Sequence, residues 1–371
     1  MIGIRVDANS IIAAGHMMRC MTIAKAITSL GSSVIFFVAD SESKKLLNNL
    51  IEPDMKTCVL NTDYKHMDDE VEKLISLLEN YDVRTLLVDS YNVTYNYFEK
   101  LKSVCKIAYL DDLLAGVYPV DLIINYSGYS FQMGYEEKYE SEGLKAKMLL
   151  GLKYAPLRKQ FYENRSDLSK IAGIEEKFYS NDDTVHRSEV KDILLATGGA
   201  DICGMILPTL KKVEESGVSQ NITWNVVVGD YVENTDEIEE YAVSHNNIRI
   251  HKSVKNMAQL MKSCQIAVLA AGTMLTECAA LGLPAVFYQV ADNQKFNVSY
   301  FGKTGGMVFA GDVTKGEVAK DKVISNIIKE IGEIISNDIK RYEMSDKLRS
   351  ITDGRGAVRI AKALMELENE A

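Results

Sequence analysis

The chain has 371 residues, a length that predicts two domains, or at most three, and excludes a single small binding module. Hydrophobic residues make up 47% and charged residues 25%, with only 5 Pro, so the composition is that of a globular protein rather than a disordered or fibrous one. Lys and Arg number 42 against 52 Asp and Glu, and the net charge of -10 provides no basic field for a nucleic acid or an anionic membrane. This charge does not exclude a small phosphorylated substrate.

The cysteines and the apolar segments indicate the compartment. The six cysteines are scattered without a CxxC pair, which favours a reducing cytoplasm over a zinc knuckle or a disulfide framework. Arg5 and Asp7 interrupt the N-terminus before the apolar region of a signal peptide can form. The longest apolar region, 264–291, is broken by Glu277, Gly282 and Pro284. We therefore expect a cytoplasmic protein with no membrane span and no evident obligate protein partner.

The first half of the chain alternates short apolar runs with amphipathic segments. Helical patterns such as Met17–Ile27 and Asp69–Leu78 separate the runs. Parallel strands need crossover connections, which are usually helices, so this alternation predicts a parallel sheet covered on both faces. The predicted strands are Ile2–Val6, Val34–Val38, Thr85–Asp89, Ile107–Leu110 and Leu122–Asn125.

A charged segment without apolar period, 168–191, interrupts this alternation and predicts a linker. It separates an N-terminal domain, 1–167, from a C-terminal domain, 192–371, which ends in an amphipathic helix over Gly356–Glu368. Two α/β domains of similar size predict a cleft between them, with ligands at the carboxyl ends of the strands. The second set of predicted strands is Ile193–Thr197, Thr223–Val228, Ile248–Ile250, Ile266–Ala270 and Ala285–Tyr288.

The loop after the first strand carries a candidate base, His16. The loop contains Ala13, Ala14 and Gly15, whose small size lets a ligand approach the backbone, and a helical pattern begins just after it. Histidine suits proton transfer near neutral pH, and the positive end of a helix favours the neutral ring, which acts as a general base. Arg19, one turn later, lies on the same side. The alternative is that His16 caps the helix and Arg19 pairs with a surface acid.

The second domain carries loops suited to a diphosphate. Its first strand runs into Gly198-Gly199-Ala200-Asp201, and the strand Ile266–Ala270 runs into a helix start. Such a start directs unpaired N–H groups and the positive dipole end at a bound anion. The alternative for the two glycines is an ordinary strand-to-helix turn. The helix start comprises Gly272, Thr273, Met274, Leu275, Thr276 and Glu277.

Glu277 is the only charged residue in 264–291, and it suits binding of ribose hydroxyls. Its alternative role is to complement the helix dipole as an ordinary first-turn acid. Asn293 and Gln294 add amide groups after the next strand. The other four histidines lie in polar or linker segments, and no HxH, HExxH or spaced carboxylate cluster indicates a metal. We expect no cofactor.

Together these motifs resemble a known family. The chain is similar to the UDP-2,4-diacetamido-2,4,6-trideoxy-β-L-altropyranose hydrolases of pseudaminic acid biosynthesis, which are related to spore-coat polysaccharide proteins and to GT-B glycosyltransferases. The similarity runs in order along nearly the whole chain. The motifs that carry it are Arg5-x-Asp7, Gly15-His16-x-x-Arg19-Cys20, Asp111-Asp112, Gly151-x-x-Tyr154-Ala155-x-x-Arg158, Gly198-Gly199-Ala200-Asp201, Gly272-Thr273 through Glu277, Gly282-Leu283-Pro284, Asn293-Gln294 and Asp353-Gly354-x-Gly356-x-x-Arg359.

The resemblance implies a fold and an activity. The fold is α/β and GT-B-like, with two Rossmann-like domains and a cleft between them. The activity is hydrolysis of a UDP-linked sugar to UDP and free sugar without a metal, with His16 as the base on water. The resemblance places Tyr91 in the substrate pocket and assigns UDP to the C-terminal domain, through the 272–277 loop and the backbone near Val254. We expect Asp7, Gly15, Arg19 and Tyr91 to bind the sugar, and Gly198, Gly199, Asp201, Val254, the 272–277 run, Asn293 and Gln294 to bind UDP.

The sequence departs from the family pattern at two positions. The family usually has Ile-Gly-x-Gly-His, and here Ala13 replaces the first glycine. Thr276 precedes the ribose-binding acid, where a family member carries Asn. These changes bear on which sugar is bound rather than on the reaction. Two other functions stay open: a GT-B glycosyltransferase that passes the sugar to a hydroxyl acceptor, and a sugar-nucleotide-binding subunit without turnover.

Overall fold

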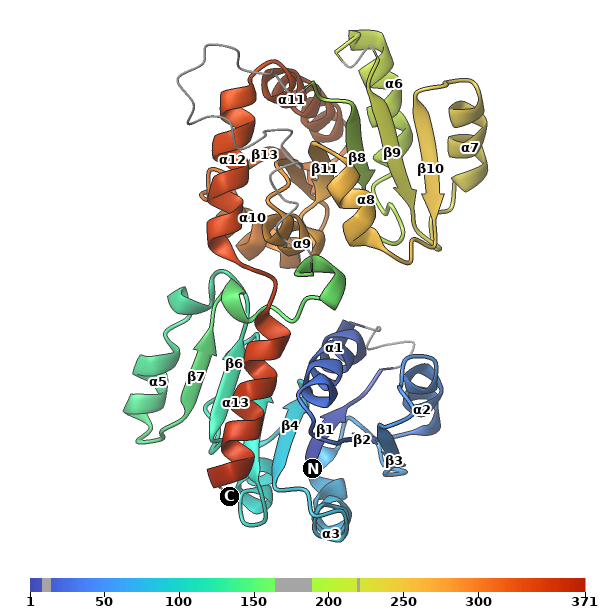
Figure 1. The fold of residues 1–371 in the computed structure, drawn as a ribbon. Coiled ribbons are helices and arrows are strands. Elements are labelled where there is room, and N and C mark those ends of the chain that lie inside the picture. Colours follow the sequence, from blue (N-terminus) through green and yellow to red (C-terminus); the bar gives the residue numbers. More distant parts are fainter. Residues whose placement is uncertain (9–14, 164–188, 219–220, 371) are drawn as a thin grey trace. The chain divides into compact units, whose positions relative to one another are not determined.

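The computed structural model describes residues 1–8, 15–163, 189–218 and 221–370. Ala13 and Ala14, and the predicted linker up to residue 188, lie outside this part of the chain. The chain divides into two compact units, shown in Figure 1. Unit 1 comprises Met1–Arg158 and Arg355–Ala371, and unit 2 comprises Lys159–Gly354.

Unit 1 is built on a parallel sheet of seven strands in the order β3-β2-β1-β4-β5-β6-β7. The central strand β1 is buried at all five positions, because helices cover both faces of the sheet. The order turns at β1, which pairs with β2 on one side and β4 on the other, as in a Rossmann fold. The strands are β1 Ile2–Val6, β2 Val34–Val38, β3 Lys56–Val59, β4 Thr85–Asp89, β5 Lys106–Leu110, β6 Leu122–Asn125 and β7 Lys147–Leu150.

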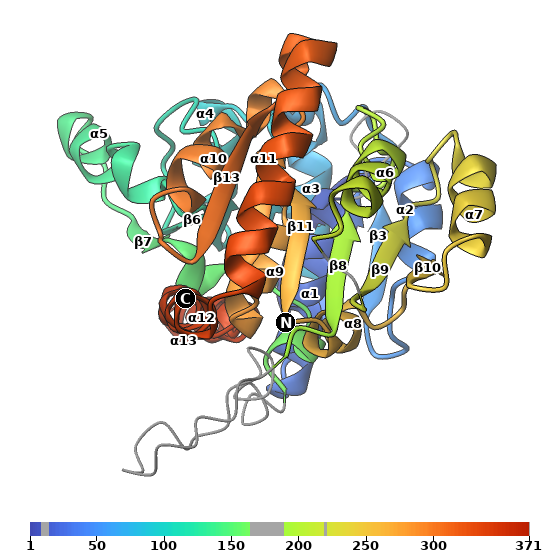
Figure 2. The same ribbon diagram turned by 90° about the horizontal axis from the view of Figure 1, so that it is seen from above.

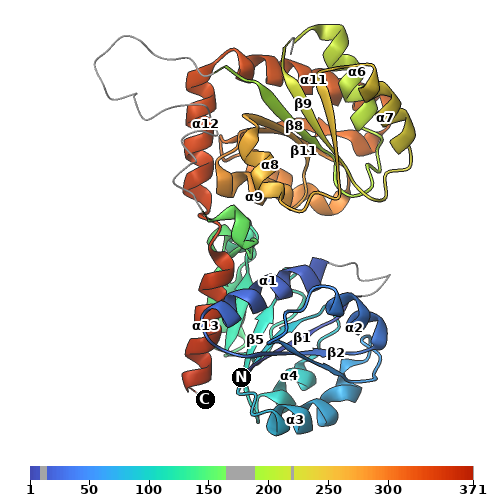
Figure 3. The same cartoon turned by 45° about the vertical axis from the view of Figure 1, so that its right-hand side comes forward.

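Two apolar cores hold the helices of unit 1 to this sheet. Figure 3 shows α1 and α3 on opposite faces of the sheet. One core joins α1, α2 and α13 to one face, and the other joins α3, α4 and α5 to the opposite face. Side chains cap the start of some of these helices: the Asp40 side chain accepts from the Ser43 N–H at the start of α2. The helices are α1 Gly15–Ser29, α2 Ser41–Asn48, α3 Val71–Asn80, α4 Tyr95–Leu101, α5 Tyr135–Ser141 and α13 Gly356–Glu370.

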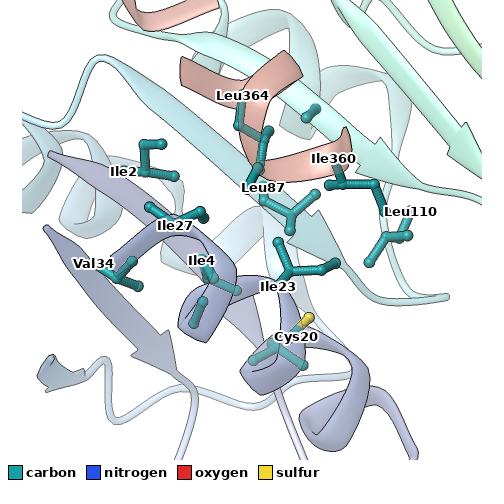
Figure 4. Packing of buried hydrophobic residues seen from close by; sticks show 14 of the residues in the cluster. Ile2, Ile4, Cys20, Ile23, Ile27, Val34, Leu87, Leu110, Ile360 and Leu364 are labelled. Atoms are coloured by element: carbon teal, nitrogen blue, oxygen red, sulfur yellow. The ribbon is translucent and has the colours of Figure 1, made fainter. Parts of the chain in front are cut away.

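The C-terminal helix α13 packs on unit 1, which corrects the predicted domain boundary. Figure 1 shows α13 alongside β6 and α1, although residues 159–354 of the chain before it form unit 2. Its apolar stripe, including Ile360 and Leu364, is buried against α1 and against Leu87 of β4 (Figure 4). An amphipathic pattern shows that a helix needs an apolar partner, but it does not identify the partner, so the sequence placed this helix in the wrong unit. Residues 159–163 in turn belong with unit 2 rather than with 1–167.

Unit 2 repeats the topology of unit 1 with six parallel strands in the order β10-β9-β8-β11-β12-β13. The order turns at β8, which pairs with β9 and with β11. The predicted α/β class with two Rossmann-like domains is therefore confirmed. The strands are β8 Asp192–Ala196, β9 Thr223–Val228, β10 Ile248–Lys252, β11 Ile266–Ala270, β12 Ala285–Gln289 and β13 Met307–Asp312.

One large core of unit 2 lies under α6 and α11, where α11 crosses β11, β12 and β13 (Figure 2). Helix α9 packs on β11, and helices α8 and α12 pack on α9. None of the helices in the described ranges is both long and apolar enough to cross a lipid bilayer. The helices are α6 Ile206–Ser216, α7 Thr235–Val243, α8 Met257–Ser263, α9 Met274–Leu281, α10 Lys295–Phe301, α11 Glu317–Ile335 and α12 Asp338–Ile351.

The predicted strands all exist, to within two residues at either end. The prediction missed β3, β7 and β13, which lie at the edges of the two sheets. These strands are only partly buried, as expected at a sheet edge, although β7 and β13 contain short apolar runs that the prediction passed over.

Candidate functional site

The first candidate site lies at the switch point of unit 1, where the carboxyl ends of β1 and β4 are adjacent. The chain leaves β1 at Val6 and enters α1 at Gly15, and β4 ends at Asp89. This arrangement brings His16 and Arg19, on the first turns of α1, against the carboxylate at the end of β4. The predicted pairing of His16 and Arg19 on one side of the helix is thus present, and Asp89 is the group that joins them.

Asp89 is a buried carboxylate that accepts several hydrogen bonds. Its Oδ1 lies 2.6 Å from His16 Nδ1 and 2.6 Å from Arg19 Nη2. Its Oδ2 accepts from Arg19 Nε at 2.6 Å and from the Cys20 thiol at 3.3 Å. Burial alone would raise the pKa of Asp89, but Arg19 and His16 outweigh it and hold that pKa at about 2. Asp89 is therefore ionised at neutral pH.

The ionised Asp89 fixes the tautomer of His16. Two acceptor atoms 2.6 Å apart would repel, so His16 Nδ1 carries the hydrogen and donates it to Asp89. Arg19 Nη2, 3.0 Å from the same nitrogen, is then a second donor directed at the same carboxylate. In the neutral ring this leaves Nε2 unprotonated, with its lone pair available to accept a proton. The arrangement is that of a general base oriented by a carboxylate.

Arg19 extends the cluster along the edge of the sheet. Its Nη1 donates to Asp112 Oδ2 at 2.9 Å and to the Tyr126 hydroxyl at 3.0 Å. Asp89, Asp112 and Tyr126 stand at the carboxyl ends of β4, β5 and β6, so one guanidinium bridges three neighbouring strands. Burial alone would lower the pKa of Arg19. The charge of Asp89 outweighs this effect, and Tyr126 and Asp112 raise the pKa further, so that it lies well above its ordinary value. The guanidinium is a permanent charge that holds the cluster rigid.

Tyr91 and Gly15 form the exposed side of this cluster. The Tyr91 hydroxyl donates to Asp112 Oδ2 at 3.1 Å, and its ring meets the His16 ring edge-on at a centroid distance of 4.8 Å. Tyr91 is 51% exposed, so one side of the ring faces solvent next to the candidate base. Gly15 is exposed, with open space where a Cβ would lie. The structure thus brings His16, Gly15, Arg19 and Tyr91 together, as predicted.

Asp7, predicted as a sugar ligand, lies elsewhere. Its side chain is buried, one oxygen pairs with Arg5 Nη1 at 2.5 Å, and the other accepts from the Ala39 N–H at 2.6 Å. Burial raises the pKa of Asp7, against the opposing effect of Arg5. Both oxygens are used inside unit 1, so the structure corrects this prediction: Asp7 holds the end of β1 to the start of the loop after β2.

Asp89 and Tyr126 are not among the candidate residues from the sequence, and Asp112 appears there only in the Asp111-Asp112 motif. Each is a polar residue at the last position of a buried apolar run or within two residues after it. That pattern is a usable signal, because such residues meet at the carboxyl edge of a parallel sheet. Which of them meet His16 depends on the strand order, and local sequence does not encode that order.

The second candidate site lies at the switch point of unit 2, between the carboxyl ends of β8 and β11. Gly198 and Gly199 follow β8, and Gly272 and Thr273 lead into α9. All three glycines have open space where a Cβ would lie, so their backbone is accessible to a ligand. The Thr273 side chain does not cap the start of α9, and the positive end of this helix suits an anion.

The other predicted nucleotide ligands have different surroundings. Glu277 is a half-buried acid in the first turn of α9, whereas Leu275 in the same turn is buried. Val254 is half-buried and follows Ser253, whose φ is +46°. Asn293 is exposed, whereas the Gln294 side chain turns back to accept from the Val290 N–H at 2.9 Å.

Asp201, predicted as a UDP ligand, is a helix cap instead. Its carboxylate accepts from the N–H groups of Met205 and Ile206, at 2.9 and 3.1 Å, and so starts α6. Asp201 is 7% exposed. Burial raises the pKa of its carboxyl group, although the two hydrogen bonds act in the opposite direction. The structure corrects this prediction, because the acid is turned into unit 2 and away from solvent. Among the described residues, no group of three or more His, Cys, Asp or Glu side chains is arranged to hold a metal ion.

Comparisons with known proteins bear on both sites. No family model matches the chain. The chain is similar to the UDP-2,4-diacetamido-2,4,6-trideoxy-β-L-altropyranose hydrolase of Campylobacter jejuni, at 23% identity over 305 residues that cover 81% of this chain and 96% of that protein. The resemblance found in the sequence is therefore confirmed.

Two further relatives are matched over part of their length. An uncharacterized protein of Methanocaldococcus jannaschii is 24% identical over 77% of this chain, and the spore coat polysaccharide biosynthesis protein SpsG of Bacillus subtilis is 22% identical over 51% of it. The match spans about half the length of each of these two relatives, 54% in both cases.

Solved structures show the fold. MurG of Acinetobacter baumannii superposes with a TM-score of 0.65 at 11% identity, covering 98% of this chain and 99% of that chain. The UDP-GlcNAc 2-epimerase of Neisseria meningitidis, bound to UDP-GlcNAc, superposes with a TM-score of 0.63 at 13% identity over the full length of both chains. The chain has a GT-B-like fold.

Proposed function

We propose that this protein is an enzyme that hydrolyses a UDP-linked amino or deoxy sugar to UDP and the free sugar. The substrate class is UDP-2,4-diacetamido-2,4,6-trideoxy-β-L-altropyranose or a close relative. The observation that carries the proposal is the His16–Asp89 contact of 2.6 Å, which leaves Nε2 of the ring as a free base at the switch point of unit 1. Its second support is the alignment with the C. jejuni hydrolase along 96% of that protein.

The reaction follows from this geometry. His16 Nε2 takes a proton from water while the water oxygen forms a bond to the anomeric carbon. The bond between that carbon and the glycosyl oxygen breaks, and its electron pair leaves with UDP. Asp89 stabilises the imidazolium that forms, since the carboxylate is already ionised and hydrogen-bonded to Nδ1. Water that attacks the face opposite UDP inverts the anomeric centre.

Unit 2 holds the nucleotide in this proposal. The exposed backbone at Gly198, Gly199 and the 272–277 turn binds the diphosphate, and the start of α9 stabilises the negative charge that develops on UDP as it leaves. Glu277 binds the ribose hydroxyls, and the backbone near Val254 binds the base. Asn293, exposed after β12, and the amide nitrogen of Gln294 bind the diphosphate or the sugar.

Unit 1 holds the sugar. Tyr91 presents the exposed part of its ring beside His16, and Gly15 leaves its backbone open to the ligand. Arg19 acts by fixing Asp89 and Asp112, since its guanidinium is already bonded to both. We place the reaction in the cytoplasm, which fits six cysteines that are all free thiols within the described residues.

The test of the base is replacement of His16 by Asn or Phe. Loss of a general base should lower kcat by at least ~100-fold. UDP affinity should stay nearly unchanged, because unit 2 holds the nucleotide. His66→Asn is the matched control, since His66 is an exposed histidine of unit 1 that also contacts a carboxylate, Asp63, at 3.2 Å. Near-normal turnover in both His16 variants would discard the assignment.

The reaction class is tested with purified protein and candidate UDP-sugars, with UDP and sugar release followed by NMR. A hydrolase releases both products in water without an added acceptor. A glycosyltransferase releases UDP only when a hydroxyl acceptor is present, and a sugar-nucleotide-binding subunit releases neither product. Acceptor-dependent release or an unchanged spectrum would contradict the proposed hydrolysis.

A further inference from the structure

The loop after β9 carries an exposed aromatic ring on a fixed backbone. The N–H of Tyr231 donates to the carbonyl oxygen of Gly199 at 3.1 Å, which joins this loop to the glycine turn after β8. A Cβ at Gly229 would lie 2.2 Å from the same oxygen, so only glycine permits this approach of the two loops. The backbone of Tyr231 is thus held, while its side chain is 80% exposed.

The loop after β10 is joined to the same loop from the other side. Ser253, whose φ is +46°, donates from its hydroxyl to Asp230 Oδ1 at 3.2 Å. Because the strand order is β10-β9-β8, the Tyr231 loop lies between the glycine turn and the loop that carries Val254. Three consecutive loops therefore form one surface, with the Tyr231 ring exposed in the middle loop.

This position is within reach of the base of a bound nucleotide. In sheets of this strand order the diphosphate binds at the turn after the first strand. The loops after β9 and β10 follow strands roughly 5 and 10 Å from β8 at the usual strand spacing. A base whose phosphates lie at Gly198 and Gly199 can reach that far.

Two other apolar side chains at this edge are similarly exposed, but they fit a base less well. Ile202 after β8 is 67% exposed and has no aromatic face. Phe296 on α10 is 62% exposed and follows β12, on the far side of the switch point from β9 and β10. A tyrosine ring is flat and has only two side-chain torsions to fix, so stacking on it costs little conformational entropy.

We propose that Tyr231 is the stacking platform for the base of the nucleoside diphosphate. This inference rests on the proposed function, which requires unit 2 to bind UDP. Stacking tolerates any base, since every base has a π face, so Tyr231 supplies affinity rather than choice of base. Choice among bases then falls to groups that reach the base edges, such as the backbone near Val254.

The test measures UDP affinity by calorimetry in the wild type and four variants. Tyr231→Ala should weaken UDP binding by roughly 5- to 100-fold, the range for loss of a base–aromatic stack. Tyr231→Phe should bind as the wild type does, and Tyr231→Leu should fall between, because it keeps apolar area without a π face. The matched control is Tyr95→Ala, since Tyr95 is a tyrosine of unit 1 that is 47% exposed, and it should leave UDP affinity unchanged.

Two further probes separate stacking from a general disturbance of the loop. Inorganic pyrophosphate, which has no base, should displace UDP from Tyr231→Ala with its wild-type affinity. CDP and dTDP should be weakened by the same factor as UDP, so that the preference among bases is retained. Wild-type UDP affinity in Tyr231→Ala, or an equal loss for pyrophosphate, would overturn this inference alone. A wild-type protein that does not bind UDP would overturn the proposed function together with it.

Discussion

The two units share one topology and use the same edge of it for different chemistry. In unit 1 the switch point between β1 and β4 is filled by ionised side chains, with Arg19 bonded to Asp89 and Asp112. In unit 2 the switch point between β8 and β11 is lined by the glycine turn after β8 and by the start of α9. The strand order provides the place, and the residue types decide what is done there.

The difference follows from what each task requires. Proton transfer needs a base held in one tautomer, and a carboxylate fixed by a guanidinium supplies this at His16. Binding of an anion needs unpaired N–H groups and no carboxylate directed at the ligand. In unit 2 the acid nearest the glycine turn, Asp201, is accordingly turned inward to cap α6. One switch point therefore suits chemistry, and the other suits recognition.

The largest expected effect is on the charged switch point. Asp89→Asn keeps one acceptor oxygen but places an amide N–H against Arg19 and His16, so the Nδ1–H tautomer loses its support. We expect kcat to fall by roughly 100- to 10,000-fold while UDP affinity is unchanged. The ¹⁵N chemical shifts of His16 report the change of tautomer directly. Asp82→Asn removes an exposed carboxylate paired with Arg84 and should leave both readings as in the wild type.

The Asp89→Asn variant should also differ from the wild type in how its stability depends on pH below neutrality. The pKa of Asp89 is about 2 in the folded protein against an ordinary value of 3.8, so the folded state binds fewer protons between these values. The stabilisation is present above about pH 4 and is lost as the pH falls towards 2; its size is roughly 2 kcal/mol. The difference in unfolding free energy between wild type and Asp89→Asn should shrink over that range. A constant difference would show that Asp89 does not hold its ion pair in solution.

A buried network of ion pairs and hydrogen bonds lies beneath the switch point of unit 1. Arg5 is fully buried and pairs with Glu70, through Nε at 2.6 Å and Nη2 at 2.9 Å, and with Asp7. Tyr97 also donates to Glu70, at 3.0 Å. Burial alone would lower the pKa of Arg5, but the two carboxylates outweigh it and raise that pKa. This network fixes the end of β1, from which the chain leads to His16.

Glu70→Ala should destabilise unit 1 by about 3–5 kcal/mol, because it leaves a buried guanidinium with one of its two carboxylates missing. Hydrogen exchange should show faster opening of unit 1 amides than of unit 2 amides. The control is Glu72→Ala, whose side chain is 85% exposed and pairs with Lys100 at 4.0 Å, and which should cost less than about 1 kcal/mol. Equal opening of both units would show that the network supports the whole chain rather than unit 1.

The sequence predicts the centres of both sheets because their strands are buried on two faces and are continuous apolar runs. It also leads to His16, which lies beyond the loop after β1, and to the glycine turns, which follow β8 and β11 closely. It does not reveal that β4 lies beside β1, so the partner of His16 was missed although Asp89 ends a predicted strand. Asp7 and Asp201 show the converse: an acid in a motif can serve the fold, and only its hydrogen bonds show this.

The smallest expected effect concerns Glu277, the one acid in the first turn of α9 at the recognition switch point. If it only complements the helix dipole, Glu277→Gln should cost a few tenths of a kcal/mol of stability, up to ~1, and hardly change UDP affinity. If it accepts hydrogen bonds from ribose hydroxyls, the same change should weaken UDP binding by ~1–2 kcal/mol, roughly 5- to 30-fold. Wild type should then prefer UDP to its 2′-deoxy and 3′-deoxy forms, and the variant should lose most of that preference. Equal discrimination in both proteins would assign Glu277 to the helix and leave the switch point of unit 2 without a charged ligand group from α9.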